Sequence, residues 1–234
     1  MAVKIIRQPD NFLLFGASKG FQLTVDCSKQ LMLYNNAEES KLLDIDLRLA
    51  DFSTTCDIVS LRLMIDTLIK SYGLQRRKVF NGDQFAPILA QHLDEIRSLL
   101  PATTSSIKDI CDKFEEFRIR FSRDLERDED HLLPDVSLSK LLHFVHPVSF
   151  WILDSRVNRV LDFWGYPESF SGFGSLLKDL FHDSEFEGFK TFLEQKNSQL
   201  VGNHPLNNLP CPFLKLLDKV LWSWATNKRK KSRQ

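Results

Sequence analysis

A single carboxylate, Asp154, directly follows four large apolar residues, Phe150-Trp151-Ile152-Leu153, near the middle of the chain. Apolar neighbours limit the solvation of a carboxylate and raise its pKa, which suits such a group to proton transfer or to stabilising a positive charge. Two arginines, Arg156 and Arg159, come just beyond it and are three residues apart, so one face of a helix would present both. Such a pair can hold phosphate groups, or it can be ordinary solvated surface charge.

Asp154 also stands where a helix is expected to begin, immediately before Ser155–Trp164. Aspartate is a favoured N-cap because its side chain accepts a hydrogen bond from the first turn and its charge meets the positive end of the helix dipole. Capping alone would explain Asp154, with the apolar residues before it belonging to the core. The sequence leaves a chemical and a purely structural explanation open.

Two other places carry candidate groups. His143 and His146 lie close together, but no third or fourth ligand accompanies them, so neither a metal nor another cofactor is predicted. In the C-terminal apolar stretch, Asp218 and Trp222 are four residues apart and would share one helix face. An amphipathic core helix would show the same pattern.

The composition is that of an ordinary globular protein with a core rich in phenylalanine. The 234 residues include 43% hydrophobic and 26% charged residues, with 19 phenylalanines against 9 glycines and 9 prolines. Because the formal net charge is zero, binding to nucleic acid would need a local basic face. The run NKRKKSRQ at residues 227–234 is one such feature, and it is either an arm on DNA phosphates or a solvated tail.

Targeting and redox features are sparse. The chain starts MAVKIIRQPDNF, without the apolar core of a signal peptide, and no apolar run reaches the roughly eighteen residues of a membrane span. The cysteines are far apart and have no metal-ligand spacing, which predicts neither a zinc site nor a disulfide framework. We expect an intracellular monomer that makes no contact with a membrane. The cysteines are Cys27, Cys56, Cys111 and Cys211.

Helical spacing of apolar residues predominates from about residue 57 onward, whereas residues 1–50 alternate short apolar pieces (VKII, FLLF, FQLTV, LMLY) with turn residues. We therefore predict a mostly α fold with a short irregular or β N-terminal segment. The N-terminal segment (1–50) is expected to pack on a helical body (51–226), followed by a basic tail (227–234). The expected helices are 58–73, ending at Gly73; 81–100, with Asp83 as a cap and Pro101 beyond it; 107–125, capped by Ser105 or Ser106; 138–144; 155–164; 173–181; 186–200; and 213–224.

Residues 133–160 resemble the helix–hairpin–helix DNA glycosylase superfamily, especially its 8-oxoguanine glycosylase branch. In that family a Leu-Pro-Gly-Val-Gly hairpin precedes a helix opened by a lysine, and a Val-Asp-Thr-His-Val-x-Arg-Val segment carries the catalytic aspartate. Here LPDVS at residues 133–137 stands at the hairpin, Lys140 stands near the lysine, and LDSRVNRV at residues 153–160 follows the aspartate segment. Asp135 and Ser137 replace the two hairpin glycines, and the interval from Lys140 to Asp154 is several residues shorter than in the family.

The resemblance implies a helix–hairpin–helix glycosylase-like fold and the chemistry of base excision. A base within a duplex must be flipped into a pocket before its N-glycosidic bond can be cleaved. Cleavage develops positive charge on the sugar, which the carboxylate of Asp154 would stabilise. If Lys140 reaches the sugar carbon, its amine attacks and forms a Schiff base, which permits strand cleavage; otherwise water is the nucleophile. The residues implied to bind DNA are Ser137, Ser139, Arg156, Arg159, Lys228, Arg229 and Lys230, and those implied to line the base pocket are Trp151, Asp218 and Trp222.

The predicted function is therefore that of a DNA glycosylase acting on a damaged or modified base in double-stranded DNA, either in DNA repair or in antiviral defence against DNA that carries modified bases. The alternative is a non-catalytic helical DNA-binding or protein-interaction module on the same scaffold. The surroundings of Asp154 distinguish the two, because an enzyme needs it in an open cationic cleft and a module needs it only as a buried cap. The shape of the pocket, rather than any motif, would select the base.

Overall fold

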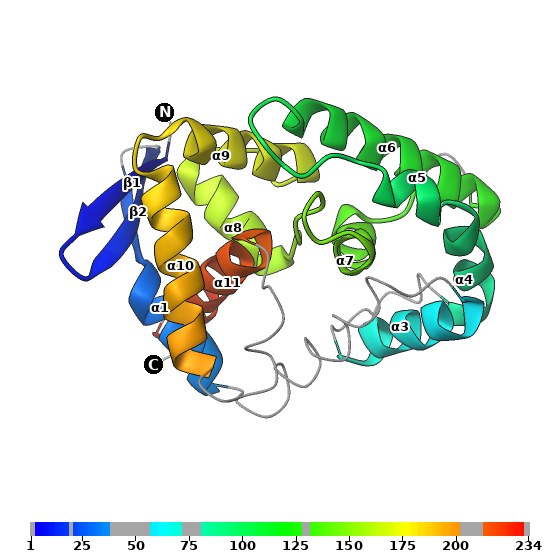
Figure 1. Cartoon of the computed structure of the whole chain (residues 1–234), viewed down its shortest axis with the longest axis horizontal. Coiled ribbons are helices and arrows are strands. Elements are labelled where there is room, and N and C mark those ends of the chain that lie inside the picture. Colours follow the sequence, from blue (N-terminus) through cyan, green and yellow to red (C-terminus); the bar gives the residue numbers. More distant parts are fainter. Residues whose placement is uncertain are drawn as a thin grey trace.

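The computed structural model describes residues 3–18, 21–37, 57–71, 81–127, 132–201 and 213–231. These residues form a mostly helical protein with a small antiparallel sheet at the N-terminal end (Figure 1). The predicted mostly α fold with a short β segment at the N-terminus is confirmed. No described helix is both long and apolar enough to cross a membrane.

The sheet is a meander of β1 (Lys4–Gln8), β2 (Asn11–Ser18) and β3 (Phe21–Asp26), in the order β1-β2-β3. The register pairs Ile5 with Leu14 and Leu14 with Val25, so these three side chains lie on one face of the sheet. All three are buried, because three helices contact the strands: α1 (Cys27–Ala37), α8 (Ser155–Trp164) and α10 (Phe186–Val201). Alternation of apolar residues along each strand thus decides which face is covered.

The helix α1 (Cys27–Ala37) follows β3 without a loop. Asp26 begins it by accepting a hydrogen bond from the backbone N–H of Lys29 at 2.9 Å. The apolar piece LMLY at residues 31–34 therefore lies in a helix, and its interpretation as a short strand-like or irregular piece was wrong. Because α1 contacts both α10 and α11 (Phe213–Lys231), the N-terminal segment is joined to the C-terminal helices.

The remaining described helices largely follow the predicted ranges, and the helix predicted for residues 155–164 has the observed bounds. The last helix continues to Lys231 instead of ending at Trp224, so residues 227–231 of the expected tail are helical. The predicted end at Gly73 lies outside the described residues. The helices are α3 (Ile58–Ser71), α4 (Gly82–Gln91), α5 (Leu93–Arg97), α6 (Ile107–Asp124), α7 (Asp135–Val145), α8 (Ser155–Trp164), α9 (Phe170–His182), α10 (Phe186–Val201) and α11 (Phe213–Lys231).

Two predicted helix starts need correction. The helix expected over residues 81–100 is divided at His92 into α4 and α5, and its N-cap is Asn81 instead of Asp83. The side chain of Asn81 accepts the hydrogen bond from the backbone N–H of Asp83 at 2.9 Å. Ser106 does precede α6, but its hydroxyl donates to the carbonyl of Pro101 at 2.7 Å and makes no capping bond to the helix.

The N-terminal elements pack against the last two helices of the chain. Figure 1 shows the sheet, α1 and α10 at one end of the molecule and α3 to α6 at the other. The helices α7, α8 and α11 lie between these ends. The chain segment 150–154, which joins α7 to α8, passes through the interior, where Phe150, Trp151, Ile152 and Leu153 are buried. The centre of the molecule is therefore built by α7, α8 and α11, and these elements carry the candidate site.

Candidate functional site

Lys140 and Asp154 form a buried ion pair. Lys140 lies in the middle of α7, and Asp154 is the last residue before α8. The Nζ atom of Lys140 is 3.0 Å from Oδ2 of Asp154, and the two side chains are only 5% and 17% exposed. The structure therefore brings the two predicted catalytic residues into contact. They are fourteen positions apart in the chain.

Asp154 uses its other oxygen as a helix cap. Its Oδ1 accepts a hydrogen bond from the backbone N–H of Arg156 at 2.8 Å, at the start of α8. The hydroxyl of Ser139 in α7 accepts a hydrogen bond from the backbone N–H of Leu153 at 3.0 Å, which fixes the segment before Asp154 against α7. Capping and pairing with Lys140 thus occur together, and the structural explanation for Asp154 does not exclude the chemical one.

The pKa of Asp154 lies below its usual value, which corrects the prediction that its apolar neighbours raise it. Burial does act to raise this pKa. The charge of Lys140, its hydrogen bond to the carboxylate, and the backbone N–H of Arg156 together outweigh that effect. Asp154 is consequently a carboxylate at neutral pH.

A second buried ion pair faces the first from α11. The Nζ atom of Lys215 is 3.2 Å from Oδ2 of Asp218, and it lies 5.9 Å from the ring centroid of Phe144 in α7. The other oxygen, Oδ1 of Asp218, is buried and has no hydrogen-bond partner among the described residues. Burial raises the pKa of Asp218, and the charge of Asp154 raises it further, while Lys215 and Lys140 oppose the increase. The two pairs therefore belong to one cluster.

Arg156 and Trp222 connect α8 to α11 beside this cluster. The guanidinium of Arg156 lies over the Trp222 ring at 4.3 Å from its centroid and donates a hydrogen bond to Thr226 at 3.1 Å. Tyr34 of α1 meets the same tryptophan edge-on, with ring centroids 5.5 Å apart. Arg156 is thus engaged within the protein, whereas Arg159, one turn further along α8, is exposed.

Three predicted contact residues lie in the interior. Trp151, predicted to line the base pocket, is fully buried, stacks on Phe170 and donates its indole N–H to the carbonyl of that residue at 3.0 Å. It is a core residue, because its ring completes the packing of α9. Ser137 and Ser139, predicted to contact DNA, are fully buried as well. Both lie on the inner side of α7, so neither hydroxyl is presented to a phosphate.

The region of the expected hairpin is held within the protein. Asp135, which stands in place of a hairpin glycine, begins α7, and its carboxylate is paired with Arg118 at 2.7 Å and accepts a hydrogen bond from the backbone N–H of Phe170 at 3.3 Å. This residue therefore joins α6, α7 and α9. The remaining predicted phosphate contacts fall in the last turns of α11, and their side chains lie outside the described part of the structure: Lys228, Arg229 and Lys230.

His143 in α7 and His146 in the turn after this helix each bond to a backbone carbonyl. Nδ1 of His143 is 2.7 Å from the oxygen of Phe150, and Nε2 of His146 is 3.0 Å from that of Leu99. These contacts hold the segment that leads to Asp154. Among the described residues, no three His, Cys, Asp or Glu side chains are grouped so that they could hold a metal ion.

Sequence reasoning missed three members of the cluster. Lys215 and Lys219 are buried in α11, and the ammonium group of Lys219 lies 5.4 Å from the ring centroid of Tyr34. Lysines on an otherwise apolar helix face are the one signal that would have identified the first two residues. Tyr34 carries no such signal, because its place depends on the packing of α1 against α11.

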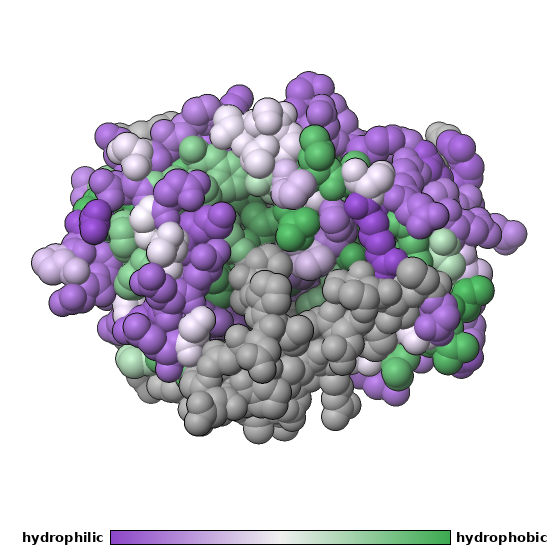
Figure 2. Space-filling model, in the orientation of Figure 1, coloured by the Kyte–Doolittle hydropathy of each residue, from purple (hydrophilic) through white to green (hydrophobic). Residues whose placement is uncertain are grey.

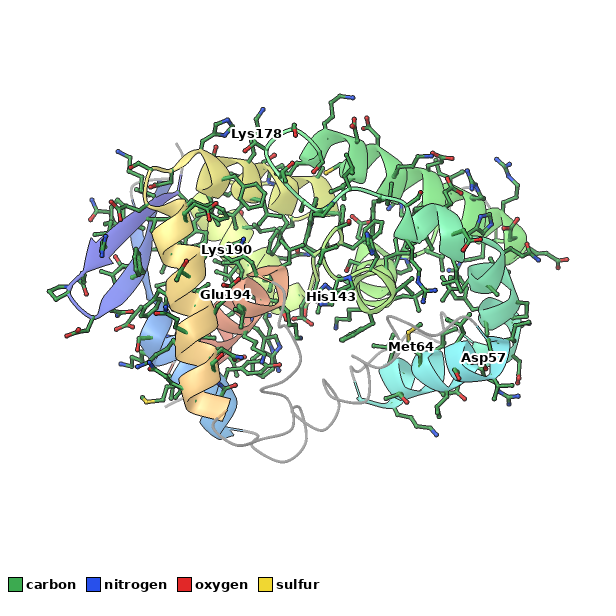
Figure 3. The ribbon with its side chains drawn as sticks, viewed as in Figure 1. Asp57, Met64, His143, Lys178, Lys190 and Glu194 are labelled. Atoms are coloured by element: carbon green, nitrogen blue, oxygen red, sulfur yellow. The ribbon has the colours of Figure 1, made fainter. Side chains whose placement is uncertain are left out.

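The site lies near the centre of the molecule. Figure 3 shows the side chains between α11 and α7, the helix that carries the labelled His143. Figure 2 shows that the surface is hollowed near the middle of the same view, where hydrophobic residues gather. Comparisons of this chain with protein-family models, with curated proteins and with solved structures each give no match.

Proposed function

We propose that this protein is a DNA glycosylase whose reacting groups are Lys140 and Asp154. The observation that carries the proposal is their buried contact of 3.0 Å. Well-packed apolar side chains usually stabilise an interior as well as a buried ion pair does, so stability alone does not account for this pair. An amine beside a carboxylate, both shielded from water, is the combination that nucleophilic attack on a sugar carbon needs.

The proposed reaction uses the two groups in sequence. The ammonium of Lys140 loses a proton to solvent, and the resulting amine attacks C1′ of the flipped nucleotide. The bond from C1′ to the base breaks, and its electron pair leaves with the base. Asp154 stays a carboxylate throughout and stabilises the positive charge that develops on the sugar. The short interval between Lys140 and Asp154 in the chain does not oppose this reaction, because the segment after α7 turns back along that helix.

The second candidate, a non-catalytic DNA-binding or protein-interaction module, has one observation in its favour. Asp154 is satisfied as the N-cap of α8, and Lys140 is 4% exposed, so the pair resembles an internal brace between α7 and α8. Such a buried cap is the arrangement expected of a non-catalytic module, whereas an enzyme was expected to hold Asp154 in an open cationic cleft. The two candidates differ in a single measurable property, the release of a base from DNA.

Incubation with duplexes that each contain one altered base tests the proposal. A suitable panel contains 8-oxoguanine, 5-hydroxymethylcytosine and 7-methylguanine, and abasic sites are scored after the reaction. We expect base release by the wild type, and a reduction of roughly 10²–10⁴-fold in folded Asp154→Asn. Lys178→Gln, which removes an exposed lysine of α9, is the matched control and should retain full activity. The absence of release from every duplex would favour the module.

Borohydride trapping distinguishes the two nucleophiles. A covalent protein–DNA adduct that forms with the wild type and is lost in Lys140→Gln supports attack by the lysine, with lyase activity. Base release without an adduct, unaffected by Lys140→Gln, identifies water as the nucleophile and leaves Asp154 as the reacting group. Repair and defence against modified DNA are then separated by which base of the panel is released.

A further inference from the structure

The face of α11 that carries Asp218 lies opposite the Lys140–Asp154 pair. Lys215, Asp218 and Trp222 follow one another at helical spacing on this face. At one end Lys215 reaches Phe144, which is one turn after Lys140 in α7. At the other end Trp222 receives Arg156, which is two residues after Asp154. Asp218 is therefore placed between the two contacts, and it faces the ion pair.

Asp218 has an oxygen available for a ligand. The residue is 4% exposed, and its Oδ2 is paired with Lys215 at 3.2 Å. Its Oδ1 is buried without a hydrogen-bond partner among the described residues. A buried carboxyl oxygen without a partner destabilises the folded protein, so it is a position where a bound group is expected.

We propose that Asp218 is a second catalytic residue, the general acid that protonates the departing base. This role rests on the proposed glycosylase function. As the bond from C1′ to the base breaks, the base keeps the electron pair and takes the proton of the Asp218 carboxyl group, so that it leaves neutral. Asp218 becomes a carboxylate, and C1′ gains a bond to the amine of Lys140 or to water.

The electrostatics of the cluster support this division of roles. Burial and the neighbouring charge of Asp154 raise the pKa of Asp218, whereas the pKa of Asp154 lies below its usual value. Two carboxyl groups whose pKa values are displaced in opposite directions are suited to act as acid and as anion at the same pH. Asp154 remains ionised beside the sugar, and the raised pKa of Asp218 favours the form that carries a proton for the base.

The charged and titratable groups around Asp218 come from each element that meets this part of α11. Lys140 belongs to α7 and Asp154 precedes α8, and both act on the pKa of Asp218. His143 is one turn after Lys140 in α7, and α10 meets α11 through aromatic rings. The neighbours in α11 and α1 are Lys215, Lys219 and Tyr34.

An acid at this position also indicates a class of substrate. A base that already carries a positive charge, such as 7-methylguanine, leaves as a neutral molecule without taking up a proton. A neutral oxidised or otherwise modified base leaves as an anion unless it is protonated. The proposal therefore assigns neutral bases to this site, and release of 7-methylguanine alone would overturn it.

The test is the pH profile of single-turnover base release, measured on the duplex that the wild type cleaves. We expect the wild-type rate to fall as the pH rises through the pKa of Asp218, and folded Asp218→Asn to lose roughly 10²–10⁴-fold and this pH dependence. Lys215→Gln removes a cation that lowers the pKa of Asp218, so the fall should move to higher pH. If the role of Asp218 were purely structural, Lys215→Gln would not change the pH at which the rate falls.

The outcomes separate this inference from the function on which it rests. If release requires Lys140 or Asp154 but proceeds at the wild-type rate in Asp218→Asn, only the role of Asp218 is overturned. An unchanged pH profile in Lys215→Gln overturns it as well, even if Asp218→Asn does not fold. If the wild type releases no base from any duplex, the glycosylase function and the acid role are both wrong.

Discussion

Asp154 and Asp218 show how the same residue type takes on different properties within one cluster. Burial opposes ionisation at both positions. At Asp154, both carboxylate oxygens have donors, from Lys140 and from the N–H of Arg156, and the pKa is lowered. At Asp218, one oxygen has no partner among the described residues, and the pKa is raised. At Asp154 the charge of Lys140 and the hydrogen bonds outweigh the effect of burial, whereas at Asp218 burial and the charge of Asp154 outweigh the effect of Lys215.

These directions predict opposite effects of pH on stability. A lowered pKa stabilises the folded state above 3.8, the ordinary value, and this contribution is lost as the pH falls through the folded-state pKa. A raised pKa stabilises the folded state below 3.8, and this contribution is lost as the pH rises from 3.8 through the folded-state pKa. The difference in unfolding free energy between the wild type and Asp154→Asn should therefore shrink at acid pH. For Asp218→Asn, the unfolding free energy relative to the wild type should instead increase towards neutral pH. Urea unfolding as a function of pH checks both, and parallel curves for the two variants would contradict the assigned directions.

The Lys140–Asp154 pair should behave as a buried ion pair when its members are removed one at a time. Lys140→Met leaves the carboxylate of Asp154 without its cation, and we expect the free energy of unfolding to fall by about 3–5 kcal/mol. Lys140→Met combined with Asp154→Asn should recover most of this loss, since asparagine can still cap α8. Chemical denaturation of the two single variants and the double variant measures the coupling. Strictly additive effects would show that the two groups do not interact.

The two arginines of α8 should differ in their contribution to DNA binding. Arg159 is exposed, whereas Arg156 is held by Trp222 and Thr226. If the protein binds DNA, Arg159→Ala should reduce the slope of log affinity against log salt concentration by about one unit, the value of one phosphate contact. Arg156→Ala should leave this slope unchanged and lower the melting temperature. If a binding titration shows a reduced slope for Arg156→Ala and an unchanged slope for Arg159→Ala, Arg156 must leave Trp222 to reach DNA.

At the scale of elements, the contact between the sheet and α8 depends on a glycine. A Cβ atom at Gly16 of β2 would lie 2.3 Å from Cδ1 of Trp164, which is buried at the end of α8. Gly16→Ala should therefore destabilise the protein by about 1–3 kcal/mol, because the ring must move within a packed interior. Gly188→Ala in α10 is the control, since its Cβ would meet only Phe12 at an ordinary 3.5 Å. Thermal unfolding of both variants tests the contact, and equal melting temperatures would contradict it.

At the scale of the molecule, the N-terminal segment belongs to the same folded unit as the C-terminal helices. The strands contact α8, α9 and α10, and α1 contacts α10 and α11, as the arrangement in Figure 1 shows. The helices α6 and α9 extend the same core, so one buried apolar cluster includes residues from both ends of the molecule.

We therefore expect cooperative unfolding, in which tryptophan fluorescence and far-ultraviolet circular dichroism follow coincident urea transitions. Of the four tryptophans, Trp151 reports on the α9 side, Trp164 on the sheet and Trp222 on α1 and α11. Separate transitions for these probes would mean that the two ends of the molecule are independent domains.

Local patterns in the sequence were sufficient to predict most of the helices and one end of the site. The range of α8 and its cap at Asp154 follow from apolar spacing and from a residue type that favours helix starts. The burial of Phe150-Trp151-Ile152-Leu153 follows from their composition. These features depend on neighbours within a few residues, which the sequence displays directly.

Only the tertiary structure decided which charged groups meet. Lys140, Asp154 and Asp218 come from three elements, and their distances depend on how α7, α8 and α11 pack. The direction of the pKa of Asp154 was predicted wrongly, because its apolar neighbours are visible in the sequence and its pairing with Lys140 is not. Trp151 was assigned to a pocket for a similar reason, since its stacking on Phe170 depends on the position of α9. Side-chain solvation and charge pairing are set by groups distant in the chain, and the fold alone determines them.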